Sequence, residues 1–398
     1  MFGVLARFCR PALCLLLGLV VARLFAPWLC GRDADAWFRG EAQIQDQLGA
    51  ELVAFEATDD QQRTPASAGD RFSGEWALVT HQMTALGLAQ LILSRPETRA
   101  RYAPVATQAA LKSMLPEMRD FGTRAWHGED ALRSLGGAHG HAYLAYAALA
   151  IGMARLVDPS FPPDQCAVHD ALIAAYERRL LASKTGLIET YPGEAYPTDS
   201  AAVAAAIAVH GRATGIDHGP VLRHWAARVR ALQIDETSGL VFQRMAAGSG
   251  QPHDVPRGSG TGLAAYFAGF ADRSLAQALA EGVFRHESDF WSFGGIREYA
   301  DGHTGHGDID SGPVIFGVSL SATGFALAPA RAFGRRDVFE RIYRSADLFG
   351  APMSFAGKRR FCTGGPIGNA LLLAFLSSGP ELAAASPKFT ASATPRDQ

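Results

Sequence analysis

The sequence is poor in charge, and this limits the classes of partner that it can bind. Of its 398 residues, 19% are charged, and the formal net charge is −2. Nucleic-acid binding normally needs a broad basic surface, which this chain does not have. The hydrophobic fraction of 48% is too high for a disordered chain and sufficient for a sizeable core. We therefore expect a folded protein that does not bind nucleic acid.

Cysteine is scarce, and its spacing fits no metal site. Cys9, Cys14 and Cys30 lie in or beside an N-terminal apolar segment, which leaves Cys166 and Cys362 for the folded part. No CxxC or Cys/His zinc spacing occurs. A disulfide between Cys166 and Cys362 is compatible with an oxidising compartment, but we expect two unpaired thiols. A Gly-rich phosphate loop, a GxSxG elbow and a HExxH motif are also absent, so we expect no cofactor and no bound metal.

The longest apolar segment lies at the N-terminus. Arg7 and Arg10 precede Pro11–Leu29, a 19-residue stretch whose one charged residue is Arg23. The basic start and the apolar run resemble a signal peptide, but no small-x-small cleavage site follows. If Arg23 snorkels, 19 residues just span a bilayer. We expect an uncleaved anchor at residues 1–30, with the remainder periplasmic or otherwise extracytoplasmic.

Beyond the anchor, the sequence changes character twice. Residues 31–70 are polar and predict a connector with one helix at Ala42–Phe55, whereas residues 379–398 predict a disordered tail. Between them, residues 71–378 alternate long Ala- and Leu-rich stretches with short Gly, Pro and Asp segments, and alternating β-branched runs are almost absent. The stretches predicted to be helices are Ala77–Leu93, His141–Leu156, Asp170–Leu181, Ala201–Thr214, Val221–Leu232, Gly262–Phe270, Ser319–Phe333 and Ala370–Leu376.

A repeat organises this region. Gly186, Gly239 and Gly295 are 53 and 56 residues apart, and each is followed by a short apolar piece, a polar loop and a helix of small residues. Looser copies begin near Gly128 and Gly357, and a first copy precedes the helix at 77–93, which makes six units. A helix pair cannot bury its apolar face alone, so such units must stack on one another. We expect an all-α fold, an (α/α)6 toroid of six helical hairpins; the alternative is an open solenoid.

In a toroid of this kind, the polar loops before the inner helices gather at one end of the ring. The richest loop carries four acids and two histidines between Glu298 and Asp310, among them His306 and Asp308. On one interpretation, Asp310 or Ser311 caps the following helix and Asp308 binds backbone amides. On the other, Asp308 or Asp310 is a general acid or base that faces the pocket. A second loop, from Tyr191 to Ser200, offers Tyr191, Tyr196 and Asp199 to the same end, and Asp199 has the same two interpretations.

Histidine and arginine supply the remaining candidates. His141, at the start of a predicted inner helix, is a candidate base or hydrogen-bond donor, and its neighbour His139 is a candidate substrate contact. His81 and Arg257 are further candidate substrate-binding residues, as are Glu298 and His306. A lone histidine is more often structural, and the H-x-H pair alone is a weak metal signal.

Dispersed matches over residues 71–345 resemble the linalool dehydratase/isomerase domain family, (α/α)6 relatives of the six-hairpin glycosidases. The matching segments are Gly140–Leu144, Ile188–Pro192 with Asp199 and Ser200, Leu232–Asp235 with Gly239, and Asp308 with Gly317. The resemblance implies that His141 is a pocket histidine. It also implies that Thr190 and Asp199 occupy the positions of that family's two active-site cysteines. The family's N-terminal catalytic Asp and Tyr have no clear counterpart in this sequence.

From these features we expect an enzyme in which Asp199, Asp308, Asp310 and His141 perform acid–base chemistry. The first hypothesis, which follows the resemblance, is lyase or isomerase chemistry on a hydroxylated substrate. The second is a glycoside hydrolase or polysaccharide lyase that acts on an envelope glycan, with Tyr191, Tyr196, Trp291 and Tyr299 stacking on sugars. The third is a membrane-tethered binding or scaffold protein without catalysis.

Overall fold

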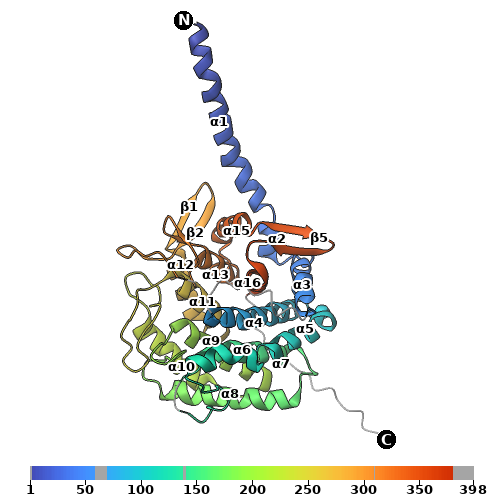
Figure 1. Cartoon of the computed structure of the whole chain (residues 1–398), viewed down its shortest axis with the longest axis vertical. Helices are drawn as coiled ribbons and strands as arrows, with labels where there is room; N and C mark the ends of the chain where they lie inside the picture. The colour runs from blue at the N-terminus through green and yellow to red at the C-terminus, as the bar shows by residue number, and fades with distance from the viewer. Residues whose placement is uncertain (1, 59–69, 138–139, 309, 380–398) are drawn as a thin grey trace.

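The computed structural model describes residues 2–58, 70–137, 140–308 and 310–379, and helices dominate it (Figure 1). The first helices are α1 (Phe2–Gly31), α2 (Ala34–Arg39), α3 (Ala42–Glu56), α4 (Asp70–Ser94), α5 (Arg99–Lys112), α6 (Pro116–Ala125), α7 (Ala145–Val157) and α8 (Pro163–Ala182). The later helices are α9 (Pro197–Thr214), α10 (Gly219–Arg228), α11 (Gly258–Ala271), α12 (Arg273–Phe284), α13 (Leu320–Phe325), α14 (Leu327–Ala332), α15 (Arg336–Gly350) and α16 (Gly365–Ser377). Short helical turns are η2 (Pro96–Thr98), η3 (Ala142–Leu144) and the π-helical η4 (Val229–Gln233).

Six inner helical segments pack side by side and close into a ring. Going round the inner wall, α4 packs on α7, α7 on α9, α9 on α11, α11 on α13 and α14, α14 on α16, and α16 returns to α4. Outside this wall, α5, α8, α10, α12, α15 and α3 each follow or precede an inner helix and cover it. The fold is therefore the predicted (α/α)6 toroid, and the open solenoid is wrong because α16 and α4 close the ring.

Small residues allow the inner helices to approach one another. In α9, the Ala-rich run from Ala201 to Val209 is buried throughout, and α7 is buried along nearly its whole length. The closing contact between α4 and α16 is also polar, because Gln90 donates a hydrogen bond of 2.7 Å to the carbonyl oxygen of Ala374. Tyr266 of α11 donates in turn to the side-chain oxygen of Gln90. One side chain thus ties three inner helices together.

Glycine 87 is required at this closing contact, which gives a first testable prediction. A Cβ atom added to Gly87 would lie 2.7 Å from Leu373 and 3.1 Å from the backbone nitrogen of Ala374. We expect Gly87→Ala to lower the free energy of unfolding by about 1–3 kcal/mol, because overpacking outweighs the helix propensity gained. Gly269→Ala is the matched control, since nothing lies within 4 Å of its added Cβ; it should stabilise α11 by about 0.5–1 kcal/mol. Chemical unfolding followed by circular dichroism measures both, and equal effects would contradict this account of ring closure.

The described residues also form two small antiparallel sheets. The first has the strand order β1-β2-β4-β3 and consists of β1 (Glu287–Phe290), β2 (Phe293–Arg297), β3 (Val314–Ile315) and β4 (Val318–Ser319). The second is the hairpin of β5 (Pro352–Phe355) and β6 (Lys358–Phe361). These strands are the extended pieces of the repeat, now paired. Both hairpins lie on the side of the domain from which α1 projects (Figure 1).

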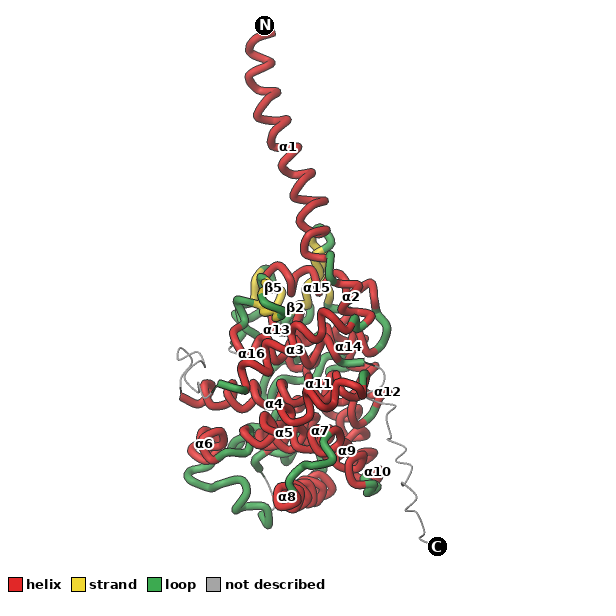
Figure 2. Tube along the Cα trace, turned by 90° about the vertical axis from the view of Figure 1, so that its right-hand side faces the viewer, coloured by secondary structure: helices red, strands yellow, loops and turns green. Residues whose placement is uncertain are grey.

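The N-terminal helix α1 extends away from the domain (Figures 1 and 2). Its side chains from Pro11 to Phe25 are exposed, and its length and composition would allow it to cross a membrane. Helix α4 satisfies the same criterion, but it is mostly buried as part of the inner wall. A signal sequence would have the same length and composition, so α1 is a candidate both for a membrane anchor and for a signal sequence.

The segment predicted as a connector contains more structure than expected. Helix α3 confirms the predicted helix at Ala42–Phe55, and it packs on α16 and β6, while α2 packs on α15. Trp37, Leu48 and Leu52 are fully buried, so residues 34–56 belong to the folded domain. Residues 59–69 of the connector and 380–398 of the predicted tail lie outside the described residues. Cys166 and Cys362 are both unpaired.

Candidate active site

The ring encloses a cavity of about 910 Å³ at the end where the inner helices begin. Its polar lining comes from α4, from the start of α7, and from the loops before and the first turns of α9, α11 and α13. The polar and aromatic lining residues include Glu75, Trp76, Tyr143, Tyr146, Thr190, Tyr191, Glu194, Tyr196, Asp199, Gln243, Arg244, Asp254, Ser259, Asp308, Asp310 and Ser321. The predicted gathering of loops at one end of the ring is therefore confirmed.

Asp199 is held in place by two hydroxyl groups. It lies in the first turn of α9, where Thr190 Oγ1 donates to one carboxylate oxygen at 2.5 Å and Tyr146 Oη donates to the other at 2.8 Å. The helix has no side-chain cap, so Asp199 does not perform the capping role considered for it. Burial raises the pKa of Asp199, although the two hydrogen bonds favour the ionised form. This carboxyl is thus fixed in orientation and faces the cavity.

Asp310 faces the same cavity under different conditions. No hydrogen bond or ion pair joins its carboxyl to another described side chain, and it is accessible from the cavity. Burial within the ring raises its pKa from 3.8 to about 6, and the charges of Asp308 and Asp199 add to this effect. Burial and the charges of Asp199 and Asp310 also raise the pKa of Tyr146. Asp199 thus contacts the Tyr146 hydroxyl directly, and both carboxyls line the same cavity.

Asp308 fixes the backbone on which Asp310 stands. Its Oδ1 accepts hydrogen bonds from the backbone N–H groups of Asp310 (3.1 Å) and Ser311 (3.0 Å), as one of its two interpretations predicted. Its Oδ2 accepts from Arg257, which also donates to Asp254 at 2.6 Å. Arg257 does not line the cavity; its guanidinium lies behind the two acids and over the Tyr299 ring. Arg257 thus holds the acidic loop through these contacts, and its binding of a substrate stays a prediction.

The expected capping role of Asp310 is wrong. Asp310 does not precede a helix, because strands β3 and β4 follow it and pair with each other, Val314 opposite Ser319. The inner helix α13 begins only at Leu320, and its cap is Ser319, whose hydroxyl accepts from the Ala322 N–H. Asp310 therefore does not cap a helix.

A second acidic group lies opposite, between α4 and the loop before α9. Tyr191 donates a hydrogen bond to Glu75, and Tyr196 donates to Glu194 at 2.8 Å. Burial and its bond to Glu194 raise the pKa of Tyr196 above its ordinary value of 10.0. Both tyrosines were predicted to line the site, and both do. Glu75 lies outside the motifs that the sequence singled out, because nothing in the helical pattern of α4 marks it as a cavity residue.

Most of the remaining lining is apolar. It is formed by α4, α11, α13, the end of α15 and the start of α16, namely Phe72, Leu78, Val79, Met83, Leu263, Val318, Leu320, Phe325, Phe349, Ile367, Leu371, Leu372 and Phe375. Phe325 and Phe375 meet edge to face with ring centroids 5.6 Å apart. The cavity is therefore amphipathic, with carboxyls and hydroxyls in one part and hydrocarbon in the other.

Several predicted site residues do not reach the cavity. His141 is buried behind Tyr143, where its Nε2 contacts Ser134 at 3.0 Å and its ring stacks on Trp126. Burial lowers the pKa of His141, so its neutral form is favoured. His141 has a left-handed backbone conformation, with φ 63°, and does not line the cavity. Its predicted role as a catalytic base gains no support from this position.

Other candidates have structural partners. His81 bonds buried Glu56 at 2.7 Å between α4 and α3. Glu298 is fully buried and accepts from the backbone N–H and the hydroxyl of Ser259 at the start of α11. His306 is exposed and outside the lining, and His139 lies outside the described residues. Neither Trp291, on the β1–β2 hairpin, nor buried Tyr299 lines the cavity.

Within the described residues, one cluster has the composition of a metal site. Ligand atoms of His169, Asp170 and His210 lie within 4.8 Å of one another. Arg155 already donates to both His169 Nδ1 and Asp170 Oδ1, so a guanidinium supplies the positive charge there. The cluster joins α7, α8 and α9 outside the cavity lining, and we interpret it as a structural polar network.

No family model and no curated protein matches this chain. Solved structures similar to it include an inactive variant of an α-1,6-mannanase of glycoside hydrolase family 76 from Salegentibacter, in complex with α-1,6-mannotriose. That structure is 13% identical, covers 86% of this chain and 99% of its own, and has a TM-score of 0.49. A member of family 76 from Bacteroides thetaiotaomicron is 10% identical over 75% of this chain and 68% of its own (TM-score 0.41). A possible family 105 member from Klebsiella pneumoniae is 12% identical over 75% and 81% (TM-score 0.43). The resemblance to linalool dehydratase/isomerase gains no support from these comparisons.

Proposed function

We propose that this protein is a membrane-anchored enzyme that cleaves a C–O bond by acid–base chemistry, most specifically a glycoside hydrolase acting on an envelope glycan. The observation that carries the proposal is the pair of carboxyls, Asp199 and Asp310, that face one cavity in different environments. Hydrolysis of a glycosidic bond requires two such groups, one that gives a proton and one that assists water or attacks carbon.

Asp310 is suited to the acid. Its pKa of about 6 keeps a substantial protonated fraction near neutral pH, and no neighbouring side chain holds its proton. It would transfer that proton to the oxygen of the leaving group as the C–O bond breaks. Asp199, oriented by Thr190 and Tyr146, would either remove a proton from the attacking water or bond to the anomeric carbon itself.

The remaining polar lining suits a sugar. Trp76, Tyr143 and Tyr191 offer aromatic faces, and Gln243 and Arg244 offer hydrogen-bond donors. The α1 helix would hold this domain at a membrane, with the domain on the extracytoplasmic side, where envelope glycans are found.

A second candidate is a dehydratase or isomerase of the linalool dehydratase/isomerase type. The apolar part of the cavity favours it, because it would accommodate the hydrocarbon of a terpenol. Asp310 would then protonate a leaving hydroxyl and Asp199 would take a proton from the adjacent carbon. Thr190 and Asp199 in place of two cysteines mean that the chemistry would rest on a carboxylate instead of thiols.

A product screen tests the proposal. The full chain in detergent would be incubated with pooled envelope glycans and terpenols, and the products analysed by mass spectrometry. We expect new reducing ends, at a rate that Asp199→Asn lowers by about 10²-fold or more and that the exposed control Asp120→Asn leaves unchanged. A product lighter by one water would favour the second candidate. If the folded protein binds these compounds without converting any of them, the binding or scaffold hypothesis replaces both.

A further inference from the structure

The apolar part of the cavity reaches the protein surface. Phe349, Thr363 and Gly364 all line the cavity, and all three are also exposed; the Phe349 side chain is 47% accessible. They come from the end of α15 and from the segment before α16, which a hydrogen bond from Thr363 Oγ1 to the Phe349 carbonyl joins. The cavity therefore opens to the protein surface at these residues. The Phe349 ring forms part of the rim of this opening, and it belongs to the apolar part of the cavity instead of the acidic part.

This opening lies beside the base of α1. Helix α1 packs on α15, and a Cβ added to Gly31 would lie 2.7 Å from Arg344 of that helix. Phe349 is slightly more than one turn beyond Arg344 along α15. Figure 1 shows α15 directly below the point where α1 leaves the domain. If α1 spans a bilayer, the opening is therefore close to the membrane surface.

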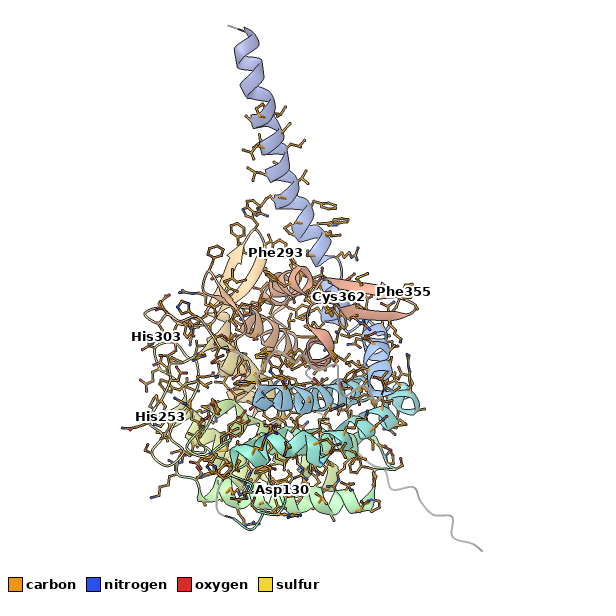
Figure 3. The ribbon with its side chains drawn as sticks, viewed as in Figure 1. Asp130, His253, Phe293, His303, Phe355 and Cys362 are labelled. Atoms are coloured by element: carbon orange, nitrogen blue, oxygen red, sulfur yellow. The ribbon has the colours of Figure 1, made fainter. Side chains whose placement is uncertain are left out.

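Several large apolar side chains are exposed on the elements around the base of α1. Leu348 (50% exposed) and Phe349 lie on α15, Met353 (66%) and Phe355 (84%) lie on the β5–β6 hairpin, and Phe290 (69%) lies on the β1–β2 hairpin. Figure 3 places Phe355 and Phe293 of the two hairpins on the α1 side, whereas His253 and Asp130 lie elsewhere on the domain. Exposed apolar side chains that surround an anchor helix are suited to the interfacial region of a bilayer.

From these observations we propose that the substrate is a membrane-borne amphiphile, a sugar head group on a hydrocarbon chain. Its head would lie between Asp199 and Asp310, while its chain would run along Phe325 and Phe375 and leave beside Phe349 toward the bilayer. This inference rests on the proposed function and on α1 being the anchor. It explains why a cavity with two carboxyls also has a wall rich in Leu, Ile and Phe side chains.

The apolar wall is otherwise difficult to account for. A purely glycan substrate would leave the hydrocarbon lining in contact with water, which is unfavourable. A terpenol-sized substrate would fill that part without needing the opening at Phe349. An amphiphile uses both parts of the cavity and the opening, and the anchor keeps the enzyme in the membrane from which the amphiphile comes.

Photocrosslinking tests the inference separately from catalysis. The full chain would be reconstituted in lipid nanodiscs with a long-chain alkyl glycoside that carries a diazirine near the end of its chain. We expect labelled peptides from the start of α16 and from α13, where Ile367, Leu371 and Phe325 line the cavity. A phospholipid with the same diazirine in its acyl chain is the comparison, and it should label these peptides much less. Equal labelling by both probes, or labelling confined to the outer hairpins, would overturn the inference.

A matched pair of variants separates the cavity from the membrane face. Phe349→Asp places a charge in the opening, whereas Leu348→Asp places the same charge next to it on α15 but outside the lining. Both residues are exposed, so both variants should fold. We expect Phe349→Asp to reduce labelling of the α16 peptide by at least about fivefold, which corresponds to roughly 1 kcal/mol of binding, and Leu348→Asp to leave it nearly unchanged. Equal losses would mean that membrane contact, not the cavity, takes up the probe. Labelling does not require turnover, so an inactive enzyme that labels as expected would refute the proposed hydrolase and leave the amphiphile site standing.

Discussion

Replacing Asp310 with Asn should remove most of the activity and at the same time stabilise the protein. The loss follows from the role of Asp310 as the group that protonates the leaving oxygen, which contributes about 10²–10⁴-fold to the rate. Asn has nearly the same shape and cannot supply that proton. A fall in kcat with little change in KM is the expected kinetic result, since the proton is transferred only in the transition state.

The gain in stability follows from the same pKa. Because the folded protein raises the pKa of Asp310 from 3.8 to about 6, it binds this proton more tightly than the unfolded chain does. The native state is therefore penalised when Asp310 ionises: the contribution of this group to stability is greatest below pH 4 and declines as the pH rises to about 6. Asn does not ionise, so above pH 6 the variant should be more stable by on the order of 1 kcal/mol, a value reduced because the carboxyl is open to water in the cavity.

The pH profile supplies an internal check. The general acid works in its protonated form, so kcat/KM of the wild-type protein should fall as the pH rises through about 6. Asp301 lies on the same loop, but its side chain is 90% exposed and paired with Arg297. The variant Asp301→Asn should therefore change neither the rate nor the alkaline limb of the profile, which is the pH range in which kcat/KM falls. Activity, thermal unfolding at pH 4 and at pH 7, and the profile would be measured on the three proteins. If the Asp310→Asn variant keeps wild-type turnover, Asp310 is not the general acid.

The sequence predicted the ring because helix patterning and repeat spacing depend on local residues. Small-residue runs such as Ala201–Ala208 and the regular glycines 186, 239 and 295 are visible without knowing any distant contact. The cavity end of the ring was predictable for the same reason, since the repeat places a polar, acidic loop before each small-residue helix, although β3 and β4 separate Asp310 from α13. The hydrogen-bond partners of the site residues were not predictable. Tyr146 reaches Asp199 across 53 positions, and Glu75 meets Tyr191 across 116, pairings that only the closed ring creates.

The histidines show the opposite limit. His141 has the residue type and the position of a catalytic base, but its ring is buried against Trp126 and does not line the cavity. One interpretation made Asp310 the cap of the next helix. The structure instead places strands β3 and β4, joined by two residue pairs, between Asp310 and that helix. Short strands of this kind carry too little alternation to be recognised in a sequence. Function in this fold thus depends on loop conformations that the helical repeat does not encode.

Arg257→Met should be the most destabilising substitution near the cavity, and it should move the pH profile to higher pH. The Arg257 side chain is mostly buried and donates to Asp254 and Asp308, while Tyr299 lies under its guanidinium. Its removal leaves two carboxylates facing each other without a counter-charge. The expected loss is about 2–3 kcal/mol, below the value for a fully buried pair because both acids are partly accessible. Arg257 also lowers the pKa of Asp310, so without it that pKa should rise and the alkaline limb of activity should follow.

Asp308→Asn makes the opposite prediction, and the two variants together decide whether this cluster sets the pH dependence. The charge of Asp308 raises the pKa of Asp310, so its neutralisation should shift the limb to lower pH, while the amide oxygen can still accept from the N–H groups of Asp310 and Ser311. Arg230→Met, which breaks an exposed pair with Asp272, is the control and should cost less than about 1 kcal/mol without moving the limb. Opposite shifts from Arg257→Met and Asp308→Asn would identify Asp310 as the titrating group, because only a carboxyl between an arginine and an aspartate responds to both with these signs. If both variants retain the wild-type limb, the proton comes from elsewhere in the cavity, and Glu75 and Glu194 become the next groups to substitute.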